Sequence, residues 1–139
     1  VNVPANGGGI PLRVSDAAGV TSAQADLLFD AALLTIPTGT FAAGGAFGGT
    51  LAVAAISGGV RVTVTGLTGA AGSNATLAAV GATVPANAPY ASKQVLALRN
   101  VTVNGTAAGG DDAVHVAAYA ADATGDRVIG ALDATRVSQ

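Results

Sequence analysis

The chain has 139 residues, of which 50% are hydrophobic and only 10% are charged, and it contains no Cys, Met or Trp. That length suits one domain with a modest core. A net charge of −2 gives no basic surface for nucleic acid, and no apolar run is long enough for insertion into a membrane. The absence of Cys excludes disulfides, and the lack of oxidisable side chains favours a secreted or cell-surface location.

The first residues predict a short strand. Val1-Asn-Val-Pro-Ala5 alternates apolar and other residues, and Pro4 has no N–H to donate, which places the strand at a sheet edge. A flexible glycine hinge, residues 6–9, follows it. We expect this segment to be an assembly strand that adds to the sheet edge of a neighbouring copy. Its residues are Val1, Asn2, Val3, Pro4 and Ala5.

Most of the remaining chain also predicts strands, because Val, Thr, Gly and Ala dominate and glycine turns recur. In the first of these strands, Ile10, Leu12 and Val14 share one face. The clearest hairpin has two alternating runs around Ser57-Gly-Gly59. Residues 41–50 predict a loop that runs into a strand. The strands are expected at 10–15, 20–29, 51–56, 60–65, 74–80, 94–103 and 113–119. The pattern predicts an all-β protein, an antiparallel β-sandwich.

Residues 10–34 carry a resemblance to a known family. They contain a strand, the turn Ser15-Asp-Ala-Ala-Gly19, a longer strand, and Phe29-Asp30-Ala31 where the family has Tyr-Asp-Pro. This order resembles the start of a cohesin module. The resemblance implies a jelly-roll β-sandwich over residues 1–119 that binds a dockerin-bearing protein or builds a cell-surface scaffold.

The C-terminal residues 120–139 contain the ligand spacing of an EF-hand-type calcium loop. Oxygen donors occupy loop positions one, three, five, seven and twelve, and they are Asp122, Thr124, Asp126, the Val128 carbonyl and Asp133. Arg127 stands at position six, where glycine is usual, and a positive φ there costs roughly 1–2 kcal/mol. With a strand before the loop and a short helix expected after it, the segment resembles a single dockerin repeat. The alternative is a chance acidic turn.

Side chains for catalysis are scarce. His115 is the single histidine, and we expect it on the outward face of its strand, opposite Val114 and Val116. No serine or aspartate is placed by motif to serve it, so we predict that the protein is not an enzyme and has no catalytic residues. Asp111 and Asp112 are expected to be solvated. Three aromatic residues are expected in the core, and they are Phe29, Phe41 and Phe47.

Three Asn-x-Thr triplets have the spacing for N-glycosylation, at Asn74, Asn100 and Asn104. They indicate either a glycan-coated extracellular protein or ordinary surface asparagines.

Two functions fit these features. The first is a non-catalytic structural subunit that joins other copies of itself head to tail into a fibre or scaffold, with N-glycans and Ca²⁺ as expected additions. The second is a monomeric recognition module, part of a larger surface protein, that binds a dockerin or a polysaccharide. An accessory domain of a carbohydrate-active enzyme is a weaker third possibility, suggested by analogy with cohesin systems.

Overall fold

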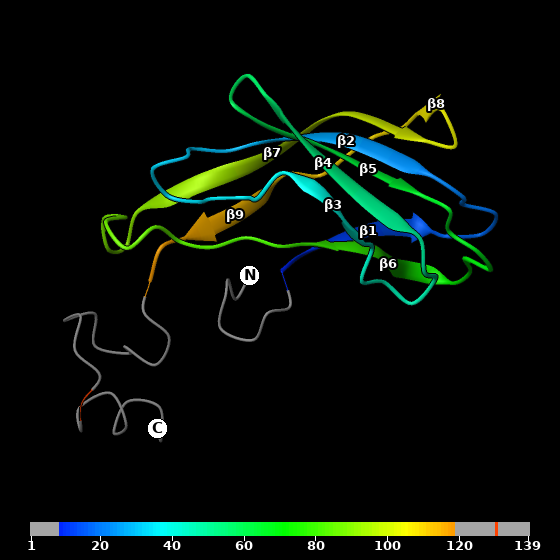
Figure 1. The fold of residues 1–139 in the computed structure, drawn as a ribbon, viewed down its shortest axis with the longest axis horizontal. Helices are drawn as coiled ribbons and strands as arrows, with labels where there is room; N and C mark the ends of the chain where they lie inside the picture. Colours follow the sequence, from blue (N-terminus) through cyan, green and yellow to red (C-terminus); the bar gives the residue numbers. More distant parts are fainter. Residues whose placement is uncertain (1–8, 119–129, 131–139) are drawn as a thin grey trace.

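The protein folds as an antiparallel β-sandwich, seen edge-on in Figure 1. The computed structural model describes residues 9–118 and residue 130, and in that part of the chain there are nine strands and no helix. The strands are β1 (Ile10–Asp16), β2 (Ala23–Leu28), β3 (Gly39–Ala42), β4 (Thr50–Ile56), β5 (Gly59–Thr65), β6 (Ser73–Val80), β7 (Lys93–Val103), β8 (Thr106–Ala107) and β9 (Ala113–Val116). The described residues contain no helix that is long and apolar enough to span a bilayer.

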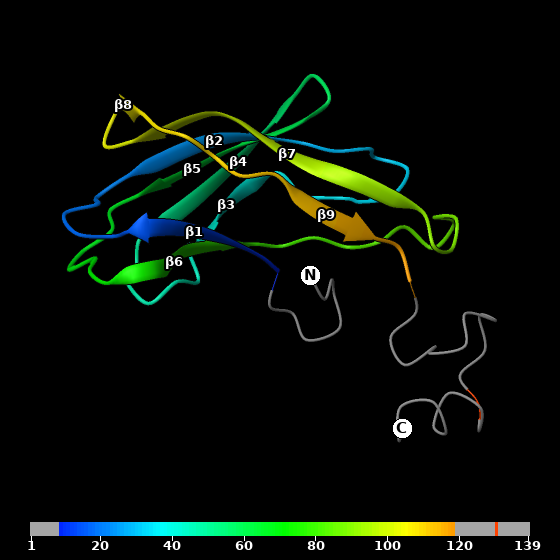
Figure 2. The same cartoon turned by 180° about the vertical axis from the view of Figure 1, so that it is seen from behind.

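The two sheets differ greatly in size. The large sheet has seven strands in the order β3-β4-β5-β2-β7-β8, with β9 also paired to β7. The small sheet has two strands, β1 and β6, which pair antiparallel with an irregularity between Leu12 and Arg13. Two strands therefore cover the inner face of a sheet more than twice as wide (Figures 1 and 2).

The core follows from alternation along the strands. In β5, Val60, Val62 and Val64 are buried, while the residues between them are more exposed, because successive side chains point to opposite faces. Leu27 on β2 and Leu51 on β4 join them from the neighbouring strands. From the small sheet, Ile10, Leu77 and Val80 are buried against this face. Small branched side chains fill the space between the sheets.

Two tight hairpins join neighbouring strands of the large sheet, and the first is the one that the sequence predicted. Ile56 pairs with Gly59 across the two-residue turn Ser57-Gly58, which joins β4 to β5. Asn104 and Gly105, at φ of 50° and 78°, connect β7 to β8. In Asn104-Gly105 both turn residues have positive φ, which is typical of a two-residue hairpin turn whose twist matches that of the strands.

The structure confirms the all-β sandwich and the shared face of Ile10, Leu12 and Val14, which points inward, with Ile10 buried and the other two half-buried. It corrects the region around Phe41, which belongs to β3 instead of a loop and is 41% exposed instead of buried in the core. The local sequence is rich in Gly and Ala, and pairing with β4 makes it a strand. Phe29 and Phe47 pack against the core, as expected.

Candidate functional site: an apolar groove beside an open sheet edge

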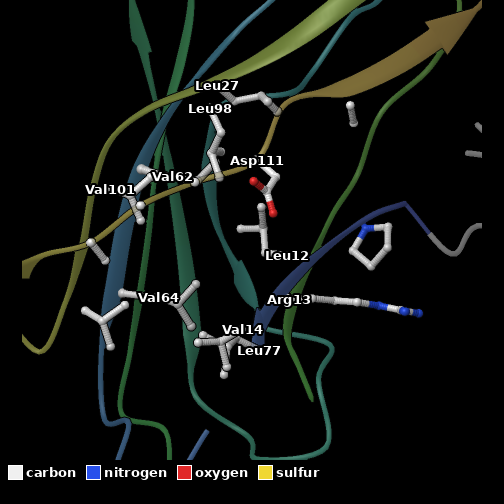
Figure 3. Close-up of a pocket in the computed structure, with 18 of the residues that line it drawn as sticks. Leu12, Arg13, Val14, Leu27, Val62, Val64, Leu77, Leu98, Val101 and Asp111 are labelled. Atoms are coloured by element: carbon white, nitrogen blue, oxygen red, sulfur yellow. The ribbon is translucent and has the colours of Figure 1, made fainter. Parts of the chain in front are cut away.

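A groove of about 610 Å³ lies between the two sheets, where the small sheet leaves the large one uncovered. Its walls are mainly apolar. Leu98 and Val101 on β7 form one wall, and Leu12 and Val14 on β1 form the other, with Val62 of β5 between them (Figure 3). Leu98 and Val101 are only half-buried, although they belong to the inner face of the large sheet. The groove is therefore a part of the sandwich interior that the small sheet does not cover.

One border of the groove is an unpaired strand edge. Within residues 9–118, β1 pairs with β6 alone. The opposite edge of β6 is partly closed, because Ala79 N–H donates to the Ala43 carbonyl at 2.8 Å and Gly44 forms a bridge with Ala78. Within residues 9–118, the free edge of the small sheet is therefore that of β1, and residues 10–15 of this strand line the groove. Figure 2 shows β1 in front of β6 and below the strands of the large sheet.

The other border is tied to β7 at its two ends. The segment between β8 and β9 runs beside β7, where Ala108 N–H donates to the Val101 carbonyl at 2.9 Å. The Asp112 carboxylate accepts from Leu98 N–H at 3.0 Å and from the Arg99 guanidinium. The Arg99 hydrogen bond, followed by that of Leu98, lowers the pKa of Asp112. Asp111 and Asp112 are both exposed, as expected of solvated side chains. Asp112 is in addition paired with Arg99, and Asp111 lines the groove.

A polar cluster lies on the outer face of the large sheet. Asp26 accepts a bidentate pair of hydrogen bonds from Arg61, at 2.6 and 2.8 Å, and a third from Asn100 Nδ2 at 2.7 Å. These groups cover the carboxylate, so Asp26 is only 4% exposed. The hydrogen bonds from Arg61 and then Asn100 lower the pKa of Asp26 to about 2. These three hydrogen bonds favour the ionised form of the carboxylate and link β2 to β5 and β7.

His115 is buried, and its predicted outward position is wrong. It does lie opposite Val114 and Val116, but the valines face outward, 63% and 43% exposed, while the histidine is 2% exposed. Gln94 Oε1 accepts the Asp30 N–H at 2.6 Å, which turns the Gln94 amide nitrogen toward His115 Nδ1 at 3.1 Å. That amide can only donate, so Nδ1 accepts and the imidazole proton is on Nε2. Burial lowers the pKa of His115. The geometry gives the ring a structural role.

The three sequon asparagines have positive φ, which asparagine tolerates better than most residues. Asn74 is exposed at the start of β6 and lines the groove. Asn104 Oδ1 accepts from the N–H groups of Thr21 and Ser22, and its Nδ2 donates to the Gly19 carbonyl at 2.9 Å. Asn100 and Asn104 therefore hold loops and side chains in place. The side-chain nitrogen of each donates one hydrogen bond. Glycosylation of these nitrogens remains a prediction.

The predicted calcium ligands Asp122, Thr124, Asp126, Val128 and Asp133, like the assembly strand Val1–Ala5, lie outside the described residues. Among the residues that the structure does describe, no group of three or more acidic or histidine side chains could hold a metal ion.

No protein-family model, curated protein or solved structure matches this chain. The resemblance to cohesins and dockerins therefore stays a hypothesis that rests on the quoted residues.

The groove is the feature that sequence reasoning missed. Its lining residues are ordinary strand valines and leucines, and nothing in their spacing separates them from the closed core. The signal that was available is the edge strand predicted for residues 1–5, which requires an acceptor edge on some other sheet.

Proposed function

We propose that the protein is a non-catalytic extracellular structural subunit that associates head to tail with copies of itself into a cell-surface fibre or scaffold. One observation carries this proposal: β1 has an edge that no strand within residues 9–118 pairs with, and this edge borders an apolar groove that opens the sandwich interior. Unpaired edges are sites for pairing with another chain, and exposed apolar grooves mark protein interaction sites. Binding of another protein chain would use both the strand edge of β1 and the apolar groove.

The chemistry of the groove supports association over catalysis. Its walls are aliphatic, and Asp111 and Arg13 at its border have no histidine beside them, since His115 is buried against Gln94. A catalytic site needs a base and a nucleophile within hydrogen-bond reach. A site for a polysaccharide would need polar groups and aromatic faces. A site for an apolar strand needs only an apolar surface and a strand edge with unpaired backbone groups.

Head-to-tail contacts use two different surfaces of each subunit, so they continue as a filament unless the rotation closes into a ring. The groove is one such surface. The low charge of the chain and its small side chains favour close packing between subunits. In this proposal the protein is secreted, its sequons are available for glycans, and Ca²⁺ bound at residues 122–133 stiffens the tail.

Size-exclusion chromatography and electron microscopy of the wild-type protein test the proposal. We expect assemblies whose size grows with protein concentration, both with calcium and with a chelator. A strict monomer at high concentration under both conditions would overturn the proposal. A pull-down with a dockerin and a glycan array would then test the alternative, a monomeric recognition module.

A further inference from the structure

We propose that the groove accepts residues 1–5 of a second copy, which add to β1 as the third strand of the small sheet. This inference rests on the proposed self-association and names the site at which it occurs. Sheets in a sandwich pack face to face about 10 Å apart, with side chains of both inner faces interdigitated. Opposite Leu98 and Val101 the small sheet has no strand from the described part of the chain, and the groove lies in that place.

The first step concerns backbone pairing, for which β1 offers a single available edge. Residues 108–112, at the other border of the groove, form no strand and are tied to β7 through the Ala108 N–H and the Asp112 carboxylate. An entering strand therefore finds a partner strand in β1 on one side and an irregular segment on the other. A strand of five residues spans roughly 17 Å, and β1 has seven residues to receive it.

The second step is that residues 1–5 suit a strand paired on one side only. In an antiparallel strand the backbone groups of alternate residues point to opposite edges. Val1, Val3 and Ala5 point to one edge, and Asn2 and Pro4 point to the other. Pro4 has no N–H, so the edge that it shares with Asn2 is the one that does not pair. The strand then pairs with β1 through Val1, Val3 and Ala5, and Pro4 faces the segment 108–112.

The third step concerns side chains. Those of Val1, Val3 and Ala5 share one face, because alternate residues of a strand do so. Turned inward, they meet the half-buried Leu98 and Val101 and continue the apolar face of β1. No residue of this segment carries a charged side chain, so none has to be desolvated.

The occupant comes from a second copy. The chain enters β1 at Gly9, where an added Cβ would lie 2.5 Å from the Val80 carbonyl oxygen. Gly9 is thus packed against the end of β6, which pairs with the edge of β1 opposite to its free edge. Because Gly9 lies at the β6 edge of β1, we infer that a strand at the opposite, free edge comes from a neighbour and not from residues 1–5 of the same copy.

Cross-linking tests the site directly, and the chain suits it because it contains no Cys. One preparation carries Val3→Cys and a second carries Leu98→Cys, and the two are mixed with a short thiol-specific cross-linker. We expect a covalent dimer on a denaturing gel. Asn2→Cys mixed with Leu98→Cys is the matched control, with at least about fivefold less dimer, because successive side chains of a strand point to opposite faces.

A charge variant gives a second measurement in the full chain. Val3→Asp would bring a carboxylate into the apolar groove, and we expect assembly to be lost. Asn2→Asp adds the same charge on the opposite face and should assemble like the wild type. Circular dichroism and melting temperature check that both variants fold.

The outcomes separate this inference from the proposed function. If the wild type assembles and Val3→Asp assembles equally well, the groove is not the site, and the subunit function stands. If Val3→Cys and Leu98→Cys cross-link only when both are in one chain, residues 1–5 occupy their own groove, and the inference is wrong. If the wild type is a strict monomer, both proposals fail.

Discussion

Asp26 combines an outward position with almost complete burial, because Arg61 and Asn100 cover its carboxylate. These bonds lower its pKa from 3.8 to about 2. A depressed carboxyl pKa stabilises the fold fully above the unfolded value, and that stability is lost as the pH falls through the folded value. We expect the melting temperature of the wild type to fall between pH 4 and pH 2, and Asp26→Asn to melt lower at pH 7 but to lose less over that window.

Asp112→Asn is the matched comparison for Asp26→Asn. Its ion pair with Arg99 is more exposed, with 37% of the Asp112 side chain and 50% of the Arg99 side chain accessible. Exposed pairs contribute little to stability, so the melting temperature at pH 7 should fall less than it does in Asp26→Asn. Thermal scans from pH 2 to pH 7 measure both effects. Equal acid sensitivity of the wild type and Asp26→Asn would contradict the assignment.

His115 predicts a second, separate pH effect. Burial lowers its pKa from 6.5, and protonation of Nδ1 would place two donors together at the Gln94 amide. A buried neutral histidine with a depressed pKa gives full stability above pH 6.5 and loses stability as the pH falls below it. The chain has one histidine, so no other imidazole contributes.

We therefore expect the melting temperature of the wild type to fall between pH 7.5 and pH 5, and His115→Gln to show a flat profile over this range. The comparison uses slopes, because the substitution itself lowers stability at every pH. Differential scanning calorimetry measures both proteins. Parallel slopes would mean that the buried ring does not titrate in this window.

At the scale of the elements, the β4–β5 hairpin depends on two glycines for different reasons. Gly58 has a φ of 76° and open space around its Cα, whereas a Cβ on Gly59 would overlap the Leu27 carbonyl oxygen on β2. Gly58→Ala should cost roughly 1–2 kcal/mol of unfolding free energy, from backbone strain alone. Gly59→Ala should cost about 3 kcal/mol, because it forces β2 and β5 apart.

Urea denaturation of the two variants measures these costs, and Gly58→Ala serves as the control for Gly59→Ala. If the two cost the same, the close approach of β5 to β2 does not limit the substitution.

The elements themselves could largely be predicted from the sequence, because alternation is a local property. It placed Ile10, Leu12 and Val14 on one face and predicted a hairpin turn at residues 57–59, which the structure shows as the two-residue turn Ser57-Gly58. Alternation does not say which face is buried, and this is why His115 was assigned to the wrong side: packing chose the face with the histidine. Phe41 shows the other limit, since pairing with β4 made a strand where the local sequence indicated a loop.

In the whole molecule, the candidate site results from the difference in size between the two sheets. The groove exists because seven strands face two, and no single strand contains that information. Val62 and Val64 lie under the groove and resemble any other strand valines. The sequence predicted the strand that could be donated at residues 1–5, and the structure adds an edge on β1 that could receive it.

The calcium prediction concerns a part of the chain separate from the groove. Asp122, Thr124, Asp126 and Asp133, with the Val128 carbonyl, have the spacing of an oxygen cage for a hard cation, and Arg127 weakens it. Isothermal titration calorimetry with Ca²⁺ should give one ion per chain.

The double variant Asp122→Ala/Asp126→Ala should abolish this heat, while Asp111→Ala, which changes an acid at the groove, should leave it intact. Ca²⁺ at about 100 times its dissociation constant should stabilise the folded wild type by roughly 2.7 kcal/mol, which raises its melting temperature. Because the groove needs no metal, Val3→Cys should still cross-link to Leu98→Cys in a chelator. No heat, together with an unchanged melting temperature, would mean that residues 122–133 are an acidic turn, and assembly would then depend on the groove alone.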